Sequence, residues 1–281
     1  MQLIDTHAHL FDKAFDEDRD SVLQRAAEAS ISRIMLPAID SSSHGRLIAL
    51  GQAHPAHCLP MMGLHPTSVN EIVEAGGSAQ LQLELERVEF MLKNPPVKRF
   101  YAVGEVGLDL YWSTVYAAEQ VEAFRFQIEL ALAHDLPLAI HTRNAWPEML
   151  KVLASYRGRG LRGVMHAFSG TLEDFRRLRT YGDFLFGIGG VVTYKKSTLA
   201  ELLPHFSPDD LVLETDAPYL TPVPMRGRRN ESSYLTYICK TVADLYGLTP
   251  EEIAERTTAN AHRIFGIDNE CVMTKTMTCN L

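Results

Sequence analysis

Several features that mark other classes of protein are missing from this sequence. Its four cysteines are scattered and include no CxxC pair, which argues against a disulfide framework or a structural zinc site. No apolar run approaches the roughly 18 residues that a membrane-spanning helix needs. The first residues also lack the basic and apolar segments of a secretory signal. These absences predict a cytoplasmic protein that does not enter a membrane.

An excess of positive charge and a dinucleotide-binding loop are also lacking. The 27 Lys and Arg residues are outnumbered by 35 Asp and Glu residues, which gives a net charge of −8. Such a chain does not bind polyanions through bulk attraction, so a nucleic-acid site would need a local basic patch or bound cations. The absence of a GxGxxG turn disfavours the alternative of an open doubly wound sheet that binds a dinucleotide.

The sequence does contain an alternation of short apolar runs and longer segments of helical period. Buried strands are predicted at 3–4, 33–39, 59–62, 101–106, 138–140, 163–165, 184–188 and 211–213. Helices are predicted over 18–30, 43–53, 79–93, 117–134, 146–156, 172–181, 197–203, 233–246 and 250–265. Eight strand–helix units predict an α/β fold, a single-domain TIM (β/α)₈ barrel over residues 1–267. Residues 268–281 show no clear period and are predicted to be a peripheral tail.

Histidines and acidic residues gather where the predicted strands end. His7 and His9 follow the first strand, and their spacing of two directs both side chains to one side of it. The other members of this group are His65, Glu105, His141, His166 and Asp216, which lie at the ends of the third, fourth, fifth, sixth and eighth strands. A single histidine of this kind is more often an ordinary core residue. Strand ends of a barrel converge on one face, however, so the joint placement predicts a shared site.

The donor types in this group indicate metal chemistry. Without His65, the four imidazoles and two carboxylates form a nitrogen and oxygen set that suits divalent ions. Six protein ligands exceed the number that one catalytic ion with an open position uses, so two ions are favoured, with Glu105 as the bridging carboxylate. Two ions roughly 3.5–4 Å apart can activate a water and stabilise the leaving oxygen of a phosphoester.

Around these residues the sequence resembles the TatD family of metal-dependent deoxyribonucleases, in the amidohydrolase superfamily. The matching segments run in family order from Ile4 to Gly266 and are IDTHAHL, GLHP, VGEVGLDLYW, IHTR, HAFSG, ETDAPYLTP, GRRNES and TTANAHRIFG. The resemblance implies two divalent ions (Mg, Mn or Zn). One ion would be held by His7, His9, Glu105 and Asp216, and the other by Glu105, His141 and His166. It also implies 3′-to-5′ exonuclease action on single-stranded DNA or DNA 3′ ends, by a monomeric enzyme.

The predicted catalytic residues are Glu105 and Asp216. A water activated by the two ions attacks the phosphorus, and Asp216 orients that water and takes its proton; the alternative is that Asp216 is only a ligand or a helix cap. Substrate contacts are predicted for His65, Arg143, Arg228 and Asn230.

Neighbouring residues receive secondary roles. Tyr111 and Trp112 are candidates for stacking on an end base or for ordinary packing at the rim. Asp5 is expected to support the HxH motif from behind, and Asp109 to be a loop or capping residue.

Two alternative functions stay open. Amidohydrolases with the same HxH motif cleave amides, lactones or phosphotriesters, and an aminoacyl ester of tRNA is a related candidate substrate. Several of these enzymes use a modified lysine where this chain has Glu105, which favours the nuclease. The second alternative is a scaffold that binds metal or nucleic acid without turnover, and the intact donor set argues against it.

Overall fold

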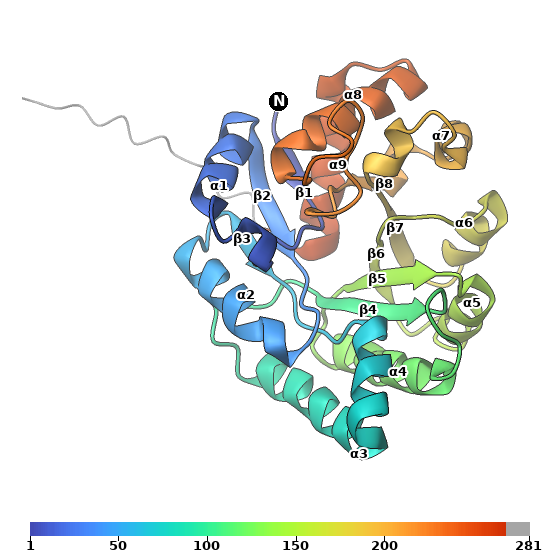
Figure 1. The fold of residues 1–281 in the computed structure, drawn as a ribbon. Coiled ribbons are helices and arrows are strands. Elements are labelled where there is room, and N and C mark those ends of the chain that lie inside the picture. Colours follow the sequence, from blue (N-terminus) through green and yellow to red (C-terminus); the bar gives the residue numbers. More distant parts are fainter. Residues whose placement is uncertain (268–281) are drawn as a thin grey trace, which may run out of the picture.

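A computed structural model describes residues 1–267, in which eight parallel strands are surrounded by helices (Figure 1). The strands are β1 (Leu3–Asp5), β2 (Ile31–Leu36), β3 (Cys58–Pro60), β4 (Val103–Asp109), β5 (Leu138–Arg143), β6 (Arg162–Met165), β7 (Asp183–Ile188) and β8 (Leu211–Leu213). Each overlaps one predicted apolar run, so the strand prediction is confirmed. The predicted tail, residues 268–281, lies outside the described residues.

The strands form a ring from two hydrogen-bonded runs, β1–β2–β3 and β4–β5–β6–β7–β8. Met62, just after β3, pairs in parallel with Val103 of β4. At the other gap Ala8 pairs in parallel with Ala217, and the Thr6 amide donates to the Leu213 carbonyl at 3.1 Å. Contacts therefore cross both gaps, as in the predicted TIM barrel.

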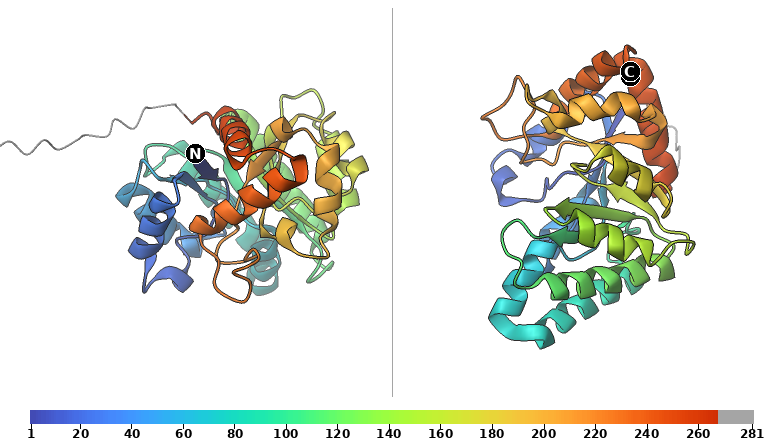
Figure 2. Two further views of the ribbon diagram at one scale, coloured as in Figure 1. Left: turned by 90° about the horizontal axis from the view of Figure 1, so that it is seen from above. Right: turned by 90° about the vertical axis from the view of Figure 1, so that its right-hand side faces the viewer.

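The helices lie outside the strands, as the views from above and from the side show (Figure 2). They are α1 (Arg19–Glu28), α2 (Ser41–Ala53), α3 (Pro66–Lys93), α4 (Ala117–Ala133), α5 (Trp146–Ala154), α6 (Leu172–Leu178), α7 (Thr198–Leu202), α8 (Leu235–Tyr246) and α9 (Pro250–Phe265). Within residues 1–267, no helix is long and apolar enough to cross a membrane.

The prediction for α3 was wrong at its beginning, since this helix begins at Pro66 and not near residue 79. Proline favours the first turn of a helix, and the His65 side chain caps it by accepting from the Thr67 amide. Gly77 has φ 69° and a non-helical backbone, so it kinks the helix. The interruption at Gly77 divides the apolar pattern, so the turns between Pro66 and Gly77 could not be predicted from periodicity.

Helix α9 closes the N-terminal end of the barrel. Ile264 and Phe265 of this helix share a buried cluster with side chains from inside the ring, including Ile4, Leu185 and Val212. The Asn260 amide also donates to the carbonyl of Leu211, where β8 begins. With this end filled, the carboxyl ends of the strands remain open to build a site.

Candidate metal centre

The first half of the site comes from opposite ends of the chain. His7 and His9 follow β1, while Asp216 follows β8. The Asp216 amide donates to the His7 carbonyl at 2.8 Å, and the His9 amide donates to the Ala217 carbonyl at 2.7 Å. Buried Asp5 adds a third link, because it accepts from both the amide and the hydroxyl of Thr215. This supporting position agrees with the role predicted for Asp5.

Glu105 lies between two pairs of histidines. Its Oε2 is 3.1 Å from His7 Nε2 and 3.6 Å from His9 Nε2. Its Oε1 is 3.1 Å from His141 Nδ1 and 3.5 Å from His65 Nε2. The carboxyl group is almost completely buried, with 3% of the side chain exposed. Each oxygen therefore faces a different pair of imidazoles, as expected for a carboxylate shared by two cations.

His166 and Asp216 complete the group of six predicted ligands, all of which lie together. His166 Nε2 is 3.6 Å from Asp216 Oδ1 and 4.0 Å from Glu105 Oε1. Its ring stacks on that of His7, with centroids 3.4 Å apart. His65 lies closer to Glu105 than His166 does, and the ligand atoms of His65, Glu105 and His141 are within 4.8 Å of one another. The structure thus makes His65 a candidate ligand, whereas the sequence analysis placed it among the substrate contacts.

Two further carboxylates lie behind the histidines. Asp109 Oδ2 is 3.0 Å from His141 Nε2, on the side of the ring away from Glu105. Glu214 Oε1 is 2.9 Å from His166 Nδ1, although this contact lacks the alignment of a hydrogen bond. A carboxylate on the outer nitrogen of a histidine fixes which nitrogen is free to bind an ion. The sequence analysis gave Asp109 a loop role and did not single out Glu214, because only the fold brings them against these rings.

Gly187 of β7 makes room for Glu214. A Cβ atom at this position would lie 2.2 Å from Glu214 Oε2, too close for any real contact. The Glu214 carboxylate is fully buried and also accepts a hydrogen bond from the Ala167 amide at 2.5 Å. Glycine is therefore required at position 187, because the Glu214 side chain lies too close to β7 for a Cβ atom there.

Electrostatics favour a cation at this site. Burial raises the pKa of Glu105, but the charges of His7 and His65 and hydrogen bonds from neighbouring imidazoles outweigh it, so the net pKa is well below the usual value. Burial lowers the pKa of His141, yet hydrogen bonds with Asp109 and Glu105 prevail and raise it to about 9. Burial likewise lowers the pKa of His166, while the charges of Glu214 and Asp216 raise it to about 10. In this cluster the carboxylates stay ionised and draw positive charge, either protons or metal ions.

The donor set fits divalent ions. The imidazole nitrogens lie between 3.1 and 4.0 Å from the oxygens of Glu105 and Asp216. Two metal–ligand bonds of about 2.0–2.2 Å, at angles typical of such sites, separate their ligand atoms by roughly 3.0–3.5 Å. His9 directs Nε2 at this group, 3.6 Å from Glu105 Oε2 and 3.5 Å from Asp216 Oδ1. Five imidazoles with two ionised carboxylates therefore form a site that can hold metal ions.

The predicted substrate contacts fall into two groups. Arg143 and Arg228 are exposed. Asn230 is fully buried, and its side-chain amide donates to the carbonyls of Thr215 and Tyr219. Its hydrogens are thus used within the protein, so Asn230 braces the loop that carries Asp216 in place of the substrate contact predicted for it.

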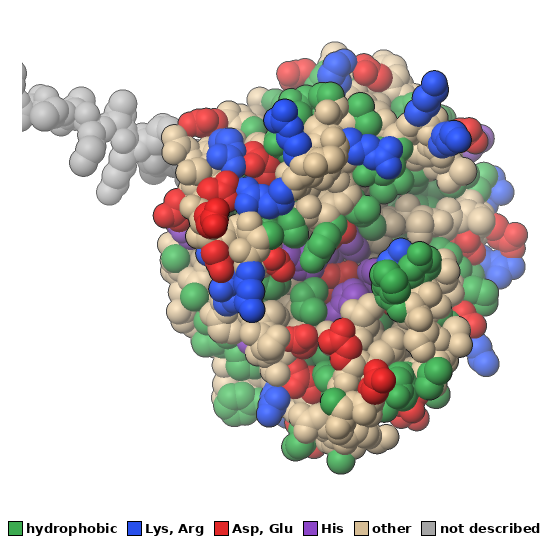
Figure 3. All heavy atoms as spheres, viewed as in Figure 1, with side chains coloured by type: hydrophobic (Ala, Val, Ile, Leu, Met, Phe, Trp, Pro, Cys, Tyr) green, Lys and Arg blue, Asp and Glu red, His purple; other side chains and the backbone are tan. Residues whose placement is uncertain are grey.

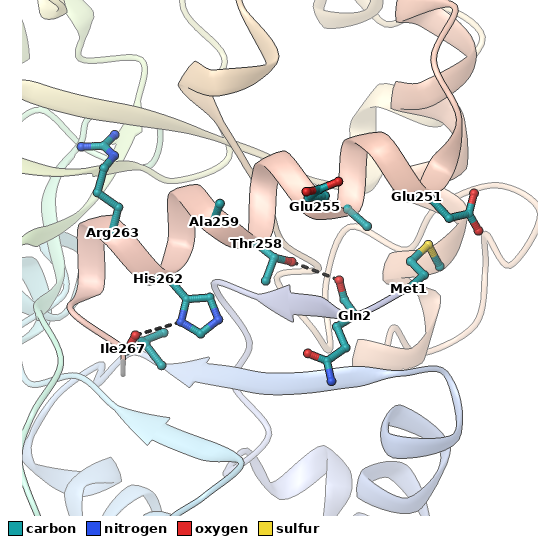
Figure 4. Close-up of a pocket in the computed structure, with 10 residues that line it drawn as sticks. Met1, Gln2, Glu251, Glu255, Thr258, Ala259, His262, Arg263 and Ile267 are labelled. Carbon is teal, nitrogen blue, oxygen red and sulfur yellow. Dashed lines mark hydrogen bonds between the residues drawn. The ribbon is translucent and has the colours of Figure 1, made fainter. Parts of the chain in front are cut away.

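The histidines lie at the floor of a hollow in the face seen in Figure 3, with acidic side chains beside them and hydrophobic ones at the margin. A different hollow, of about 780 Å³, runs along α9 (Figure 4). Its lining includes Thr258, which donates to the Gln2 carbonyl, and His262, which is bonded to the Ile267 carbonyl. Within residues 1–267, none of the three groups of convergent metal-type ligands includes a residue of that hollow. The candidate metal ligands therefore lie at the opposite end of the barrel from the hollow along α9.

Known proteins are similar to this chain over nearly its whole length. The family described as TatD related DNase matches residues 4–266. The uncharacterised metal-dependent hydrolase YabD of Bacillus subtilis is 33% identical over 267 residues, covering 95% of this chain and all of YabD. A 3′-5′ ssDNA/RNA exonuclease, TatD of Erwinia billingiae, is also 33% identical, covering 94% of this chain and 98% of its own length.

A solved structure agrees with the sequence matches. YjjV, a TatD homologue from Escherichia coli, superposes with a TM-score of 0.84 at 28% identity, covering 95% of this chain and 98% of YjjV. The resemblance that the motifs indicated is thus confirmed over nearly the whole chain. The chain belongs to the TatD-related DNase family of metal-dependent hydrolases.

Proposed function

We propose that this protein is a phosphodiesterase that removes nucleotides from single-stranded DNA in the 3′-to-5′ direction. The observation that carries the proposal is the position of Glu105, whose two oxygens face separate pairs of histidines. A shared carboxylate of this kind fits two ions, the arrangement used for in-line displacement at phosphate. Relatives named as 3′-5′ ssDNA/RNA exonucleases, 31–33% identical, support the same substrate class.

We assign the ions to the two halves of the centre. His7, His9 and Asp216 would hold one ion, His141 and His166 the other, and Glu105 would contact both. His65 is a further candidate ligand beside His141. When bound, the divalent ions supply positive charge that lowers the pKa of a water and stabilises the phosphate. Metal analysis of the purified protein should find two ions per chain, and Mg, Mn and Zn are the candidates to test.

Asp216 is the base in the proposed mechanism. Its side chain is 15% exposed, compared with 3% for Glu105, so it has an edge toward the rim where substrate enters. Burial raises its pKa, but the charge of His166 and the nearby His9 and His7 outweigh burial, and the net pKa is lowered. Its backbone has φ 58°, and strained backbone of this kind clusters at functional sites. An ionised carboxylate in this position can orient a water and accept its proton.

The reaction then proceeds at the terminal linkage. The water oxygen forms a bond to phosphorus, its proton goes to Asp216, and the bond between phosphorus and the 3′ oxygen of the next nucleotide breaks. The leaving oxygen takes up a proton, which Asp216 can return, and a 5′-mononucleotide is released. We propose that Arg143 and Arg228, exposed at the rim, contact the phosphates of the strand.

Nucleotide release from end-labelled single-stranded DNA tests the proposal. The protein is assayed with Mg²⁺, Mn²⁺, Zn²⁺ or Co²⁺, and the label at either end gives the direction of digestion. A Glu105→Gln variant controls for contaminating nucleases, because it removes the shared carboxylate charge. No release with any ion refutes the proposed function. An amide, a simple ester and an aminoacyl-tRNA ester in the same panel test the alternative hydrolases, and no turnover of any substrate would indicate the binding scaffold.

A further inference from the structure

An exposed aromatic pair lies beside an arginine next to the metal centre. Tyr111 and Trp112 follow β4 and are 50% and 70% exposed. Their rings meet edge to face with centroids 4.9 Å apart. The guanidinium carbon of Arg143, at the end of β5, is 3.7 Å from the centroid of Tyr111 and 5.5 Å from that of Trp112. Tryptophan is highly buried on average, so one that is held in the open at the rim of a site indicates a surface used for binding.

The position of this group is fixed by Asp109, the same residue that contacts His141. Asp109 Oδ1 accepts from the Tyr111 amide at 3.0 Å, while Oδ2 is 3.0 Å from His141 Nε2. The Asp109 amide in turn donates to the buried side chain of Gln120 at 2.8 Å. One carboxylate therefore holds both a candidate metal ligand and the backbone of the aromatic pair.

Arg143 brings charge to the same place. It follows His141 by two residues on β5, and its side chain is exposed. A guanidinium that stacks through its face keeps its N–H groups in the plane of the group, where they can donate to phosphate oxygens. Contact with the Tyr111 ring thus orients the Arg143 guanidinium without neutralising its charge. A protein of net charge −8 needs such a local positive charge in order to bind a polyanion.

We propose that Tyr111, Trp112 and Arg143, here named the aromatic platform, form a nucleotide subsite beside the scissile bond. This inference rests on the proposed function and adds the part of the substrate that is recognised. A base stacks on the exposed indole of Trp112, and Arg143 donates to the phosphate of the same nucleotide. Every base has an aromatic face, so the subsite accepts any sequence but requires an unstacked base. The protein therefore acts on single-stranded ends in preference to paired ones.

Kinetics with abasic substrates test the role of Trp112. Single-stranded oligonucleotides are prepared with an abasic site at each of the last three positions, together with the unmodified strand. We expect Trp112→Ala to lower kcat/KM on the unmodified strand by about 5- to 150-fold, the range for loss of one base stack. One of the three abasic strands should lack the base that stacks on Trp112. On that strand Trp112→Ala should have almost no further effect on kcat/KM, because the contact is already missing. Phe90→Ala, which removes an aromatic side chain 63% exposed on α3, is the matched control and should change nothing.

Arginine and fluorescence measurements complete the test. Arg143→Ala should weaken natural and abasic strands equally and reduce the salt dependence of binding. In Mg²⁺, a phosphorothioate-linked tetrathymidylate should quench the fluorescence of the unmodified protein but not of Trp112→Phe, in which Trp146 is the remaining tryptophan. Equal effects of Trp112→Ala on all strands, or quenching that survives Trp112→Phe, overturn the platform. If no strand is cleaved by the unmodified protein, the proposed function fails, and the quenching result still decides whether the platform binds a base.

Discussion

Replacing Asp109 by asparagine should disable His141 through a change of tautomer. The Asp109 Oδ1 atom accepts from the Tyr111 amide, so the asparagine oxygen is expected to remain there. Its NH₂ group then takes the place of Oδ2, 3.0 Å from His141 Nε2. That nitrogen must now accept a hydrogen bond, which moves the ring proton to Nδ1. Nδ1 is the atom 3.1 Å from Glu105, so the nitrogen that faces the metal centre loses its free lone pair.

The expected effect is substantial. Changing a partner behind a metal-binding histidine typically costs 10- to 100-fold in metal affinity or activity, about 1.4–2.7 kcal/mol. We expect Asp109→Asn to reach the upper part of this range, because the substitution reverses the direction of the hydrogen bond. Titration calorimetry with Zn²⁺ measures the affinity, and nucleotide release measures kcat/KM. A thermal unfolding scan confirms that the variant is folded.

Glu214→Gln is the matched control, because here the amide oxygen can stay at the Oε1 position. That atom accepts from the Ala167 amide and faces His166, while the NH₂ group would face the Thr6 hydroxyl, 3.5 Å from Oε2. The tautomer of His166 is then preserved, so we expect a loss smaller than about 10-fold. Wild-type metal affinity in Asp109→Asn, or an equal loss in both variants, refutes the tautomer reasoning.

Four further outcomes are expected. Asp216→Asn should abolish turnover in metal-loaded protein while leaving thermal unfolding unchanged, and substantial activity would remove Asp216 as the base. Burial raises the pKa of Asp5 from 3.8 to about 7, so its contribution to stability is present below pH 4 and is lost as the pH rises to about 7. In EDTA, the free energy of urea unfolding of the unmodified protein should fall by up to about 4 kcal/mol more than that of Asp5→Asn between these pH limits. Parallel plots of unfolding free energy against pH for the two proteins would contradict this. Gly187→Ala should lower both the melting temperature and activity, because the new Cβ displaces the Glu214 carboxylate. If neither quantity changes, the backbone of β7 has shifted to make room for the Cβ. Arg228→Ala should reduce the slope of log binding constant against log salt by about 1, and an unaltered slope would exclude a phosphate contact.

The sequence by itself determined the architecture and the location of the chemistry. Strands buried on both faces must be short and apolar, and amphipathic helices must repeat every 3.6 residues, so the eight units could be predicted from local pattern. Parallel strands in a barrel end at one face. His7, Glu105 and Asp216 lie at the ends of the predicted strands, which predicted that residues distant in the chain would meet, and the structure brings them together. Glu105 itself lies within β4, which continues to Asp109.

Only the tertiary structure decided which side chains contact which. The pairing of His65 with Glu105 and the place of Asp109 and Glu214 behind two histidines depend on strand register and side-chain rotamers. Asn230 turns inward to backbone carbonyls for the same kind of reason. Local periodicity reports which face of a strand or helix is buried. It carries no information on contacts across the barrel, because these are set by how separate elements pack against one another.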